Sequence, residues 1–186
     1  MILLVGLGNP TPDSKDNRHN IGFKIIDAIN QKFSLSKQKP KFKGLLTTGN
    51  ILDKKVYAIK PLTFMNNSGI CIRELIEYFK IGVEDIIVFH DDLDIDFGKV
   101  KAKFGGSSAG HNGIESIDKF VGKDYFRVRI GIGKPDSKVT SADYVLNNFN
   151  EDEKLELEKI TDNIIESLSI LIDKKLDLFS STVNNK

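Results

Sequence analysis

An uninterrupted apolar stretch in the middle of the chain, residues 86–89, restricts the possible fold more than any other feature. A run of Ile, Val and Phe without alternating polar residues is typical of a strand buried on both faces, as in a parallel sheet covered by helices. The run stops at His90, Asp91 and Asp92. In open sheets of this kind, ligands bind just beyond the carboxyl ends of the strands. We therefore expect a functional site at this edge of the sheet; the alternative is an ordinary solvated acidic turn.

Strands and helices alternate along the rest of the chain. Apolar runs and period-two alternation indicate strands, and apolar residues three or four positions apart indicate helices. The expected strands are residues 2–7, 45–51, 56–59, 86–89, 99–104 and 126–132. The expected helices are residues 20–33, 68–80 and 113–120, and a last helix that begins at Asn150. This order predicts one α/β domain over residues 1–186, with three layers: a mixed β-sheet and helices on both of its faces.

Helix ends and connections carry more local signals. Gly82 stands just after the second expected helix, in the region where glycine favours helix termination. Asn150 and Glu153 have the spacing of a capping box at the start of the last helix. Residues 34–43 and 135–141 are expected to be polar connections, and residues 180–186 are expected to form a frayed tail.

Composition limits the class of protein. The chain has 186 residues, 27 Lys and Arg against 26 Asp and Glu, and one cysteine, Cys71. A single cysteine excludes an internal disulfide and a cysteine-based zinc site, and no apolar run approaches the roughly 20 residues that span a membrane. The start of the chain lacks the pattern of a signal peptide. We therefore expect a cytoplasmic protein without a membrane segment.

Charge is unevenly distributed, although the net charge is only +1. Lysine and arginine dominate residues 24–60 and 96–138, whereas acids dominate residues 150–178. A basic body with an acidic segment is compatible with a phosphate-rich partner. It is equally compatible with a surface that is simply solvated.

Four loops that could end at the same sheet edge each carry an amide or an imidazole near glycine or proline. These residues are Asn9 in G-N-P, His19 in R-H-N, Asn66 in F-M-N-N-S-G and Asn112 in G-H-N-G. Asparagine supplies a donor and an acceptor without adding charge, and glycine lets the backbone approach a ligand closely. Taken singly, each has an ordinary explanation as a turn residue or a helix cap. Their joint placement in four loops favours a shared site.

Other chemistries fit the sequence poorly. It has no G-x-S-x-G nucleophile elbow and no P-loop. Gly6 and Gly8 begin a dinucleotide fingerprint, but Thr11 stands in the place of its third glycine. The acids between Asp91 and Asp96 offer an alternative, a Mg²⁺ site, if the strand continues far enough to place them on one side.

Without a nucleophile, a metal or a cofactor, the simplest chemistry is a water molecule activated by histidine, which suits general-base catalysis near neutral pH. A carboxylate such as Asp91 would orient the ring and stabilise its charged form. Neutral donors such as asparagine amides would stabilise the developing oxyanion. An ester is the expected substrate class, because unassisted attack of water on an amide faces a higher barrier.

Six motifs together resemble one known family. The motifs are V-G-L-G-N-P (Val5–Pro10), R-H-N (Arg18–Asn20), F-M-N-N-S-G (Phe64–Gly69), H-D-D-L-D (His90–Asp94), G-H-N-G (Gly110–Gly113) and R-I-G-I-G (Arg129–Gly133). In order and spacing, over essentially the whole chain, they resemble the bacterial peptidyl-tRNA hydrolases. The resemblance implies hydrolysis of the ester that joins a peptide to the 3′ ribose of tRNA, by a cytoplasmic monomer without metal or cofactor.

The resemblance also implies a role for individual residues. His19 would be the catalytic base and Asp91 its partner, and Asn9 would help distinguish N-blocked from free aminoacyl esters. The expected substrate contacts are Phe64, Asn66 and Asn112, of which Asn112 also positions the water. The expected contacts to the tRNA backbone are Lys101, Lys103 and Arg129.

Two residues depart from the family pattern. The family usually has glycine where this chain has Thr11, and a tyrosine that lines the site where this chain has Ser14. Ser14 is therefore included among the expected substrate contacts. Two other functions stay open: a non-catalytic RNA-binding paralogue, and a Mg²⁺-dependent phosphohydrolase built on the acids of residues 91–96.

Overall fold

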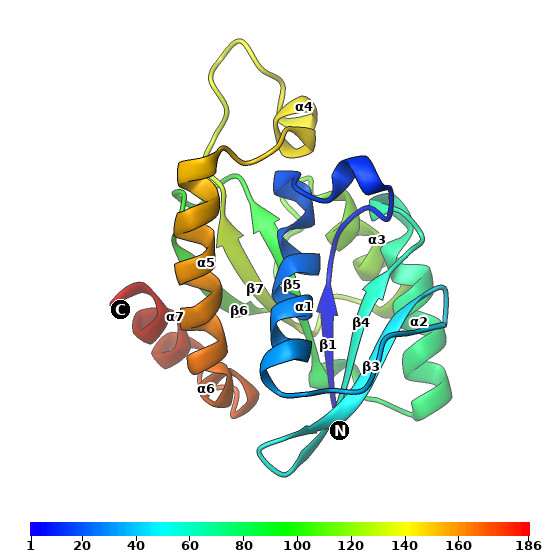
Figure 1. Ribbon diagram of the computed structural model, residues 1–186. Coiled ribbons are helices and arrows are strands. Elements are labelled where there is room, and N and C mark those ends of the chain that lie inside the picture. Colours follow the sequence, from blue (N-terminus) through cyan, green and yellow to red (C-terminus); the bar gives the residue numbers. More distant parts are fainter.

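The computed structural model describes residues 1–186. Its centre is a seven-stranded mixed sheet with the strand order β2-β3-β4-β1-β5-β7-β6 (Figure 1). The strands are β1 (Ile2–Gly6), β2 (Lys39–Lys41), β3 (Gly44–Ile51), β4 (Lys54–Pro61), β5 (Ile86–Asp92), β6 (Val100–Phe104) and β7 (Phe126–Gly131). Strands β4, β1, β5 and β7 are parallel neighbours, and β3 and β6 pair with them in the antiparallel direction. The predicted mixed sheet is confirmed, and β2 adds a short edge strand inside the expected connection 34–43.

The helices agree with the predicted ones except near the carboxyl terminus. They are α1 (Ile21–Lys32), α2 (Ser68–Phe79), α3 (Asn112–Val121), α4 (Ser141–Leu146), α5 (Glu151–Glu166), α6 (Leu168–Ile172) and α7 (Leu176–Asn184). The capping box at the start of α5 is confirmed, because Asn150 and Glu153 bond to each other's backbone N–H. The short helix α4 was not predicted. None of these helices is both long and apolar enough to cross a membrane.

Two hydrophobic clusters lie on opposite faces of the sheet, and alternate residues of the central strands supply them. In β5, Ile87 and Phe89 belong to one cluster, whereas Ile86 and Val88 belong to the other. The first cluster includes apolar residues of α1 and α5, and the second those of α2 and α3, which gives the three layers visible in Figure 1. The strand has to be apolar throughout, because each side chain meets a core on one face or the other.

The end of α2 differs from its prediction. Lys80, with φ 58°, takes the left-handed conformation that closes the helix, and its N–H donates to the carbonyl of Ile76. Gly82 instead has an extended backbone, with φ −70°, and begins the next turn. The residue that terminates the helix thus stands two positions before Gly82, and the next residue, Ile81, is buried in the core at 6% exposure. A Cβ on Gly82 would meet only the carboxylate of Glu84, an exposed side chain that can move aside.

The carboxyl terminus is ordered, so the predicted frayed tail is wrong. Residues 180–184 belong to α7, which packs beside the edge strand β6 (Figure 1). The Asn184 side chain accepts from Val100 N–H and donates to Val100 O, at 2.9 Å each, and Ser180 Oγ accepts from Ala102 N–H at 2.9 Å. These side chains replace the backbone partners that a further strand would supply, and thereby cover an edge that is otherwise open to pairing with another chain. Contacts between segments so far apart leave no local signal in the sequence.

We expect Asn184→Ala to lower the free energy of unfolding by about 1–2 kcal/mol, because two backbone groups of the edge strand lose their partner. The measurement is urea unfolding followed by circular dichroism. Asn185→Ala is the matched control, since Asn185 is exposed and its loss is expected to stay within about 0.5 kcal/mol. Equal stability of the two variants would contradict the role of α7 as a cover for the edge.

Candidate active site

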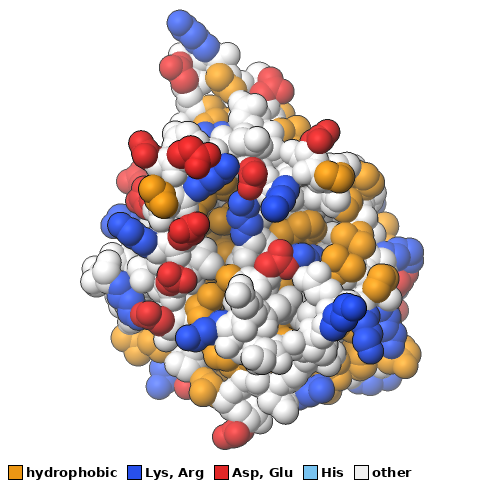
Figure 2. Space-filling model, in the orientation of Figure 1, with side chains coloured by type: hydrophobic (Ala, Val, Ile, Leu, Met, Phe, Trp, Pro, Cys, Tyr) orange, Lys and Arg blue, Asp and Glu red, His pale blue; other side chains and the backbone are white.

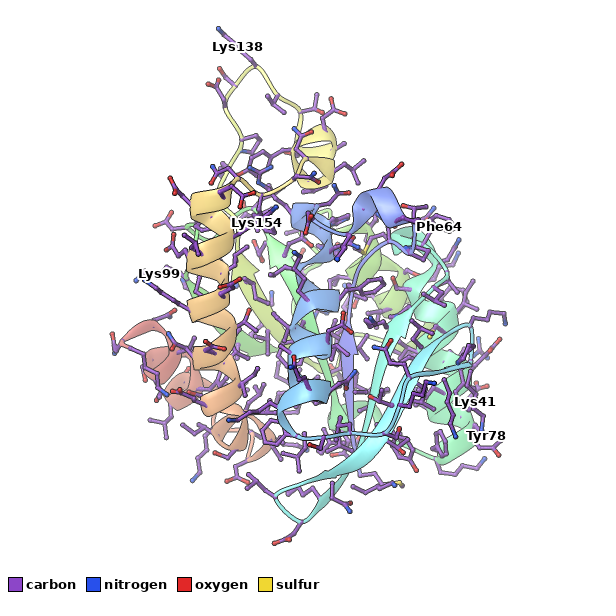
Figure 3. The ribbon with its side chains drawn as sticks, in the orientation of Figure 1. Lys41, Phe64, Tyr78, Lys99, Lys138 and Lys154 are labelled. Atoms are coloured by element: carbon purple, nitrogen blue, oxygen red, sulfur yellow. The ribbon has the colours of Figure 1, made fainter.

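A cleft of about 720 Å³ lies at the carboxyl edge of the central strands. The end of β5 forms its floor, and residues 108–112 form one wall. The opposite wall consists of residues 134–139 and of α4. Figure 3 shows this second wall as a loop that rises above the sheet, with Lys138 at its tip.

His19 reaches this cleft because α1 packs very close to the sheet. A Cβ on Gly22, in the first turn of α1, would lie 2.4 Å from both Leu7 N and Phe89 O. A Cβ on Gly6 of β1 would lie 2.2 Å from the carbonyl oxygen of Gly22. Only glycine on both sides permits this approach. The two glycines therefore set the distance between the turn that carries His19 and the end of β5.

His19 and Asp91 are in direct contact, as the sequence led us to expect. The Nδ1 atom of His19 lies 2.9 Å from both carboxylate oxygens of Asp91, and both side chains are buried. A carboxylate only accepts, so Nδ1 carries the proton and Nε2 keeps its lone pair. Nε2 makes no hydrogen bond within the protein, and His19 lines the cleft. This geometry is what a histidine needs to take a proton from a bound molecule.

His111 is a member of the site that the sequence analysis missed. Its Nε2 lies 2.9 Å from Asp91 Oδ1, and its ring lies 4.8 Å from that of His19. Its Nδ1 accepts from the N–H groups of Gly113 and Ile114, so that His111 caps α3. The cap fixes the tautomer, because Nδ1 accepts and Nε2 must donate to Asp91. The sequence signal for His111 is its place in G-H-N-G, directly before Asn112 and at the start of the predicted helix.

The two imidazoles determine the charge of the carboxylate. Burial alone would raise the pKa of Asp91, but His111 and His19, which donate to its oxygens, hold that pKa well below its usual range. His90 is different: its Nδ1 donates to the carbonyl of Asp91 at 2.8 Å. Burial, with a smaller contribution from His111, lowers the pKa of His90 to about 3. His90 is therefore neutral at physiological pH, and Asp91 is ionised.

Of the three asparagines, Asn112 is the one that lines the cleft with this group. It is the first residue of α3 and lines the cleft together with His19 and Asp91. Asn9 has a different position, in which its Oδ1 accepts from Met65 N–H and its backbone N–H donates to Asn20 Oδ1, at 2.9 Å each. Asn9 therefore ties the loop after β1 to the loop before α2. Its Nδ2 has no partner within the protein.

Three other predicted site residues do not line the cleft. Phe64 is 51% exposed with φ 64°, and it lies at the surface near the start of α2 (Figure 3). Asn66 is exposed in the turn that follows it. Ser14 is buried, and its Oγ lies 2.7 Å from Oγ1 of Thr11. The two departures from the family pattern are thus in contact with each other, and neither lines the cleft.

The predicted basic residues share one face of β6 and β7. Lys101 pairs with Arg129 across the two strands. Lys103 lies two positions further along β6, and burial, with Arg129 and Arg127 nearby, lowers its pKa. Arg129 also donates from Nε to Asp92 Oδ2 at 2.8 Å. These contacts place a group of cations directly beside the end of β5.

Arg127 belongs to the same alternating pattern but is 1% exposed. Its guanidinium donates to Asp118 Oδ1 of α3 and to the carbonyl of Ser107, at 3.0 Å each. It therefore holds the Gly/Ser stretch and α3 against the sheet, and it is not part of the basic surface. Period-two alternation alone does not separate a buried, paired arginine from an exposed one.

The acids of residues 91–96 do not converge on one point. Strand β5 ends at Asp92, so the alternation that would have aligned Asp92 and Asp94 stops there. Asp92 accepts from Arg129 and from Asp94 N–H. The alternative Mg²⁺ site is therefore not supported by the geometry.

The imidazole–carboxylate–imidazole group is compact enough for a metal to be considered. One ligand atom each from His19, Asp91 and His111 lies within 4.8 Å of the others. A metal on Nε2 of His111 would move that proton to Nδ1, where it would face the N–H groups of Gly113 and Ile114. Donors would then oppose donors, at the cost of two hydrogen bonds. The hydrogen-bond pattern fits proton chemistry better than metal binding.

A mixed sheet with helices on both faces, and a histidine–aspartate pair at the carboxyl edge of its central strands, defines an α/β protein with a candidate hydrolytic site. Residues 3–186 match the family model described as peptidyl-tRNA hydrolase. The chain is 82% identical over 186 residues to the peptidyl-tRNA hydrolase of Pelagibacter ubique (strain HTCC1062), with 100% of both chains covered. It belongs to the peptidyl-tRNA hydrolase family.

More distant relatives agree with this assignment. The peptidyl-tRNA hydrolase of Ehrlichia canis (strain Jake) is 44% identical over 183 residues, which cover 98% of this chain and 94% of the relative. The crystal structure of peptidyl-tRNA hydrolase from Acinetobacter baumannii matches with a TM-score of 0.92 at 32% identity, over 99% of this chain and 94% of that one. The predicted fold class and the predicted family are both confirmed.

Substitution of His111 should separate its two contacts. His111→Ala removes both the cap of α3 and the bond to Asp91, whereas His111→Asn keeps a side-chain oxygen that can cap the helix. We expect His111→Ala to lower the free energy of unfolding by about 1 kcal/mol more than His111→Asn. Urea unfolding at pH 7 measures the difference. Equal losses in the two variants would mean that the cap contributes nothing.

Proposed function

We propose that this chain hydrolyses the ester bond between the peptide and the 3′ ribose in peptidyl-tRNA, releasing the free tRNA and the peptide. Family membership and the names of the relatives support the substrate class. The observation that carries the mechanism is the bond from His19 Nδ1 to Asp91, which leaves Nε2 free in the cleft. Because peptidyl-tRNA is a product of translation, we place the activity in the cytoplasm, and we expect a monomer.

His19 acts as the general base in this proposal. Its Nε2 takes a proton from a water molecule, whose oxygen attacks the ester carbonyl carbon. Asp91 fixes the ring and stabilises the imidazolium that forms. The tetrahedral intermediate then expels the ribose oxygen, which receives the proton from Nε2. The step needs neither a metal nor a cofactor.

Asn112 and His111 complete the reacting centre. The amide of Asn112, at the amino-terminal end of α3, supplies a donor for the water or for the oxyanion, where the partial positive charge of the helix end also favours a negative oxygen. His111 donates to the Asp91 oxygen, so that the carboxylate stays ionised and aligned while His19 gains its proton.

Asn9, Phe64 and Asn66 contact the substrate outside this centre. Asn9 and the backbone of Met65 are hydrogen-bonded, so these residues lie in neighbouring loops. The unpartnered Nδ2 of Asn9 is a donor for the amide carbonyl of an N-blocked aminoacyl group, which supports its role in discrimination. Phe64 and Asn66 are exposed at the surface, where a bound peptide that leaves the cleft can reach them. Ser14 lies outside the lining of the cleft, and its hydroxyl bonds that of Thr11, so this proposal gives it no substrate contact.

Lys101, Lys103 and Arg129 bind the sugar–phosphate backbone of the tRNA. Their support is the shared face of β6 and β7 beside the end of β5. Contacts of this kind position a nucleic acid without reading its sequence. Acidic side chains gather instead over α5 (Figure 2). The face of α5 is therefore unsuited to the same partner.

We expect His19→Ala to reduce turnover by a factor of about 10² or more, the size of lost general-base catalysis. The measurement is cleavage of N-acetyl-aminoacyl-tRNA in excess EDTA, together with tRNA binding on the same preparation. Unchanged binding with lost cleavage is the expected result. Near-normal cleavage would remove His19 from the role of base, and binding without cleavage by the unsubstituted chain would favour the RNA-binding paralogue. Loss of activity in EDTA would revive the metal-dependent alternative.

Neutralising the basic face should weaken tRNA binding without affecting chemistry. For Lys101→Gln combined with Lys103→Gln, we expect a higher KM, an unchanged kcat and a salt dependence of binding that is reduced by about one phosphate contact per lysine. Lys159→Gln is the control, because Lys159 is an exposed lysine of α5. Equal effects of the control and the double variant would contradict the placement of the tRNA.

A further inference from the structure

Arg18 joins the turn that carries His19 to the opposite wall of the cleft. The segment before His19 pairs with residues 147–149: Arg18 N–H donates to Asn147 O and Phe149 N–H donates to Asp16 O, at 3.1 Å each. Between them, Asn17 forms an isolated antiparallel bridge with Asn148. The proposed base is thus attached to a segment that lies more than a hundred residues later in the chain.

The guanidinium of Arg18 extends this attachment to α4 and α5. Its central carbon lies 4.2 Å from the ring centroid of Tyr144, and Nη1 donates to the carbonyls of Tyr144 and Asn147 at 3.4 and 3.3 Å. Its Nη2 lies 3.2 Å from Glu153 Oε1. The side chain is only 12% exposed, so these contacts are largely shielded from water.

The partners of Arg18 are themselves fixed. The hydroxyl of Tyr144 donates to the carbonyl of Ile132 at 2.7 Å, at the end of the last central strand. Glu153 Oε1 also accepts from Asn150 N–H in the capping box of α5. Lys154, in the first turn of α5 (Figure 3), lies 3.8 Å from Asp16. Arg18, Tyr144 and Glu153, which we call the Arg18 clasp, therefore connect three segments at one point.

The clasp matters because apolar packing holds α4 only partly: of its residues, Tyr144 and Val145 pack against the core, and both are only partly buried. None of the six residues of α4 is fully buried, although Ser141, Ala142 and Val145 line the cleft. A short helix without a buried side chain gains little from the hydrophobic effect. Its position over the cleft therefore depends in part on polar contacts, among them the bond from the Tyr144 hydroxyl to Ile132 and the contacts from Arg18, the residue next to His19.

We propose that Arg18 is a positioning residue for the reaction: it holds the α4 wall of the cleft at a fixed place relative to His19. This inference rests on the proposed function. Arginine suits the task because its planar fork bonds several oxygens while its face stacks on a tyrosine ring. Lysine would keep the charge near Glu153 but lose the fork and the stack. A substrate that touches α4 would then be presented to the base in a less precise orientation.

The test compares Arg18→Gln, Arg18→Lys and Tyr144→Leu by steady-state kinetics on N-acetyl-aminoacyl-tRNA, well below their melting temperatures. We expect kcat to fall on the order of tenfold or more in each, as for a misplaced reacting group, while the Kd for deacylated tRNA stays unchanged. Arg18→Lys should not rescue kcat. The double variant Arg18→Gln with Tyr144→Leu should lose no more than the worse single variant, because both act through one contact.

Two further variants separate geometry from charge. Glu153→Gln keeps an oxygen for Nη2 and should retain kcat within about threefold, since a neutral acceptor still bonds the fork. Arg73→Gln removes an arginine that is paired with Glu77 on the surface of α2, and it should match the unsubstituted chain. A loss in Arg73→Gln equal to that in Arg18→Gln would overturn the proposal.

Three more results would overturn it: a lower melting temperature of Arg18→Gln with unchanged kcat and KM, full rescue by lysine, or strictly additive effects in the double variant. His19→Ala is assayed in parallel. An active His19→Ala would refute the proposed base itself. An inactive His19→Ala beside a fully active Arg18→Gln would refute only the role of Arg18.

Discussion

The carboxylate of Asp91 is the group on which the rest of the site depends. It is 2% exposed at the end of a central strand, where an ionised oxygen is stable only if donors replace the water it has lost. The two donors come from different layers of the fold. His19 precedes α1, which packs on one face of the sheet, and His111 begins α3, which packs on the other. One buried charge therefore brings both helical layers to the same point of the sheet edge.

The sequence predicted those parts of the molecule in which a short sequence pattern has one structural explanation, such as a buried strand or a helix cap. The apolar run at 86–89 predicted a central strand, because four consecutive buried side chains require a core on both faces of the sheet. His19 and Asp91 followed from the motifs around them, and Asn150 with Glu153 followed from a spacing that only a helix start explains. A local pattern could not identify which distant residue of the chain a side chain contacts. The burial of Arg127 depends on Asp118, and the order of the last helix depends on bonds from Asn184 to Val100.

Errors in the prediction share the same origin. Glycine often terminates helices, which led to the prediction for Gly82. In the structure Lys80 terminates α2 instead, and Ile81, the residue after it, is buried in the core. Ser14, a predicted substrate contact, does not line the cleft, and its hydroxyl shares a hydrogen bond with that of Thr11. In each case a contact formed in the folded structure outweighed the preference of the residue type for a local conformation or role.

The two sides of the cleft are held by different kinds of interaction, and this difference suits the proposed chemistry. On the side of the base, Gly6 and Gly22 let backbone approach backbone, and the fully buried core beneath them leaves no freedom to shift. On the side of α4, the largely shielded guanidinium of Arg18 adds polar contacts to the partial packing of Tyr144 and Val145 on the core. Proton transfer from water requires a fixed distance between the proposed base and the carboxylate. A wall that is not buried in the core can adjust when a substrate as large as a tRNA binds. A polar attachment through the neighbour of the base gives that wall a defined place relative to His19 without burying it.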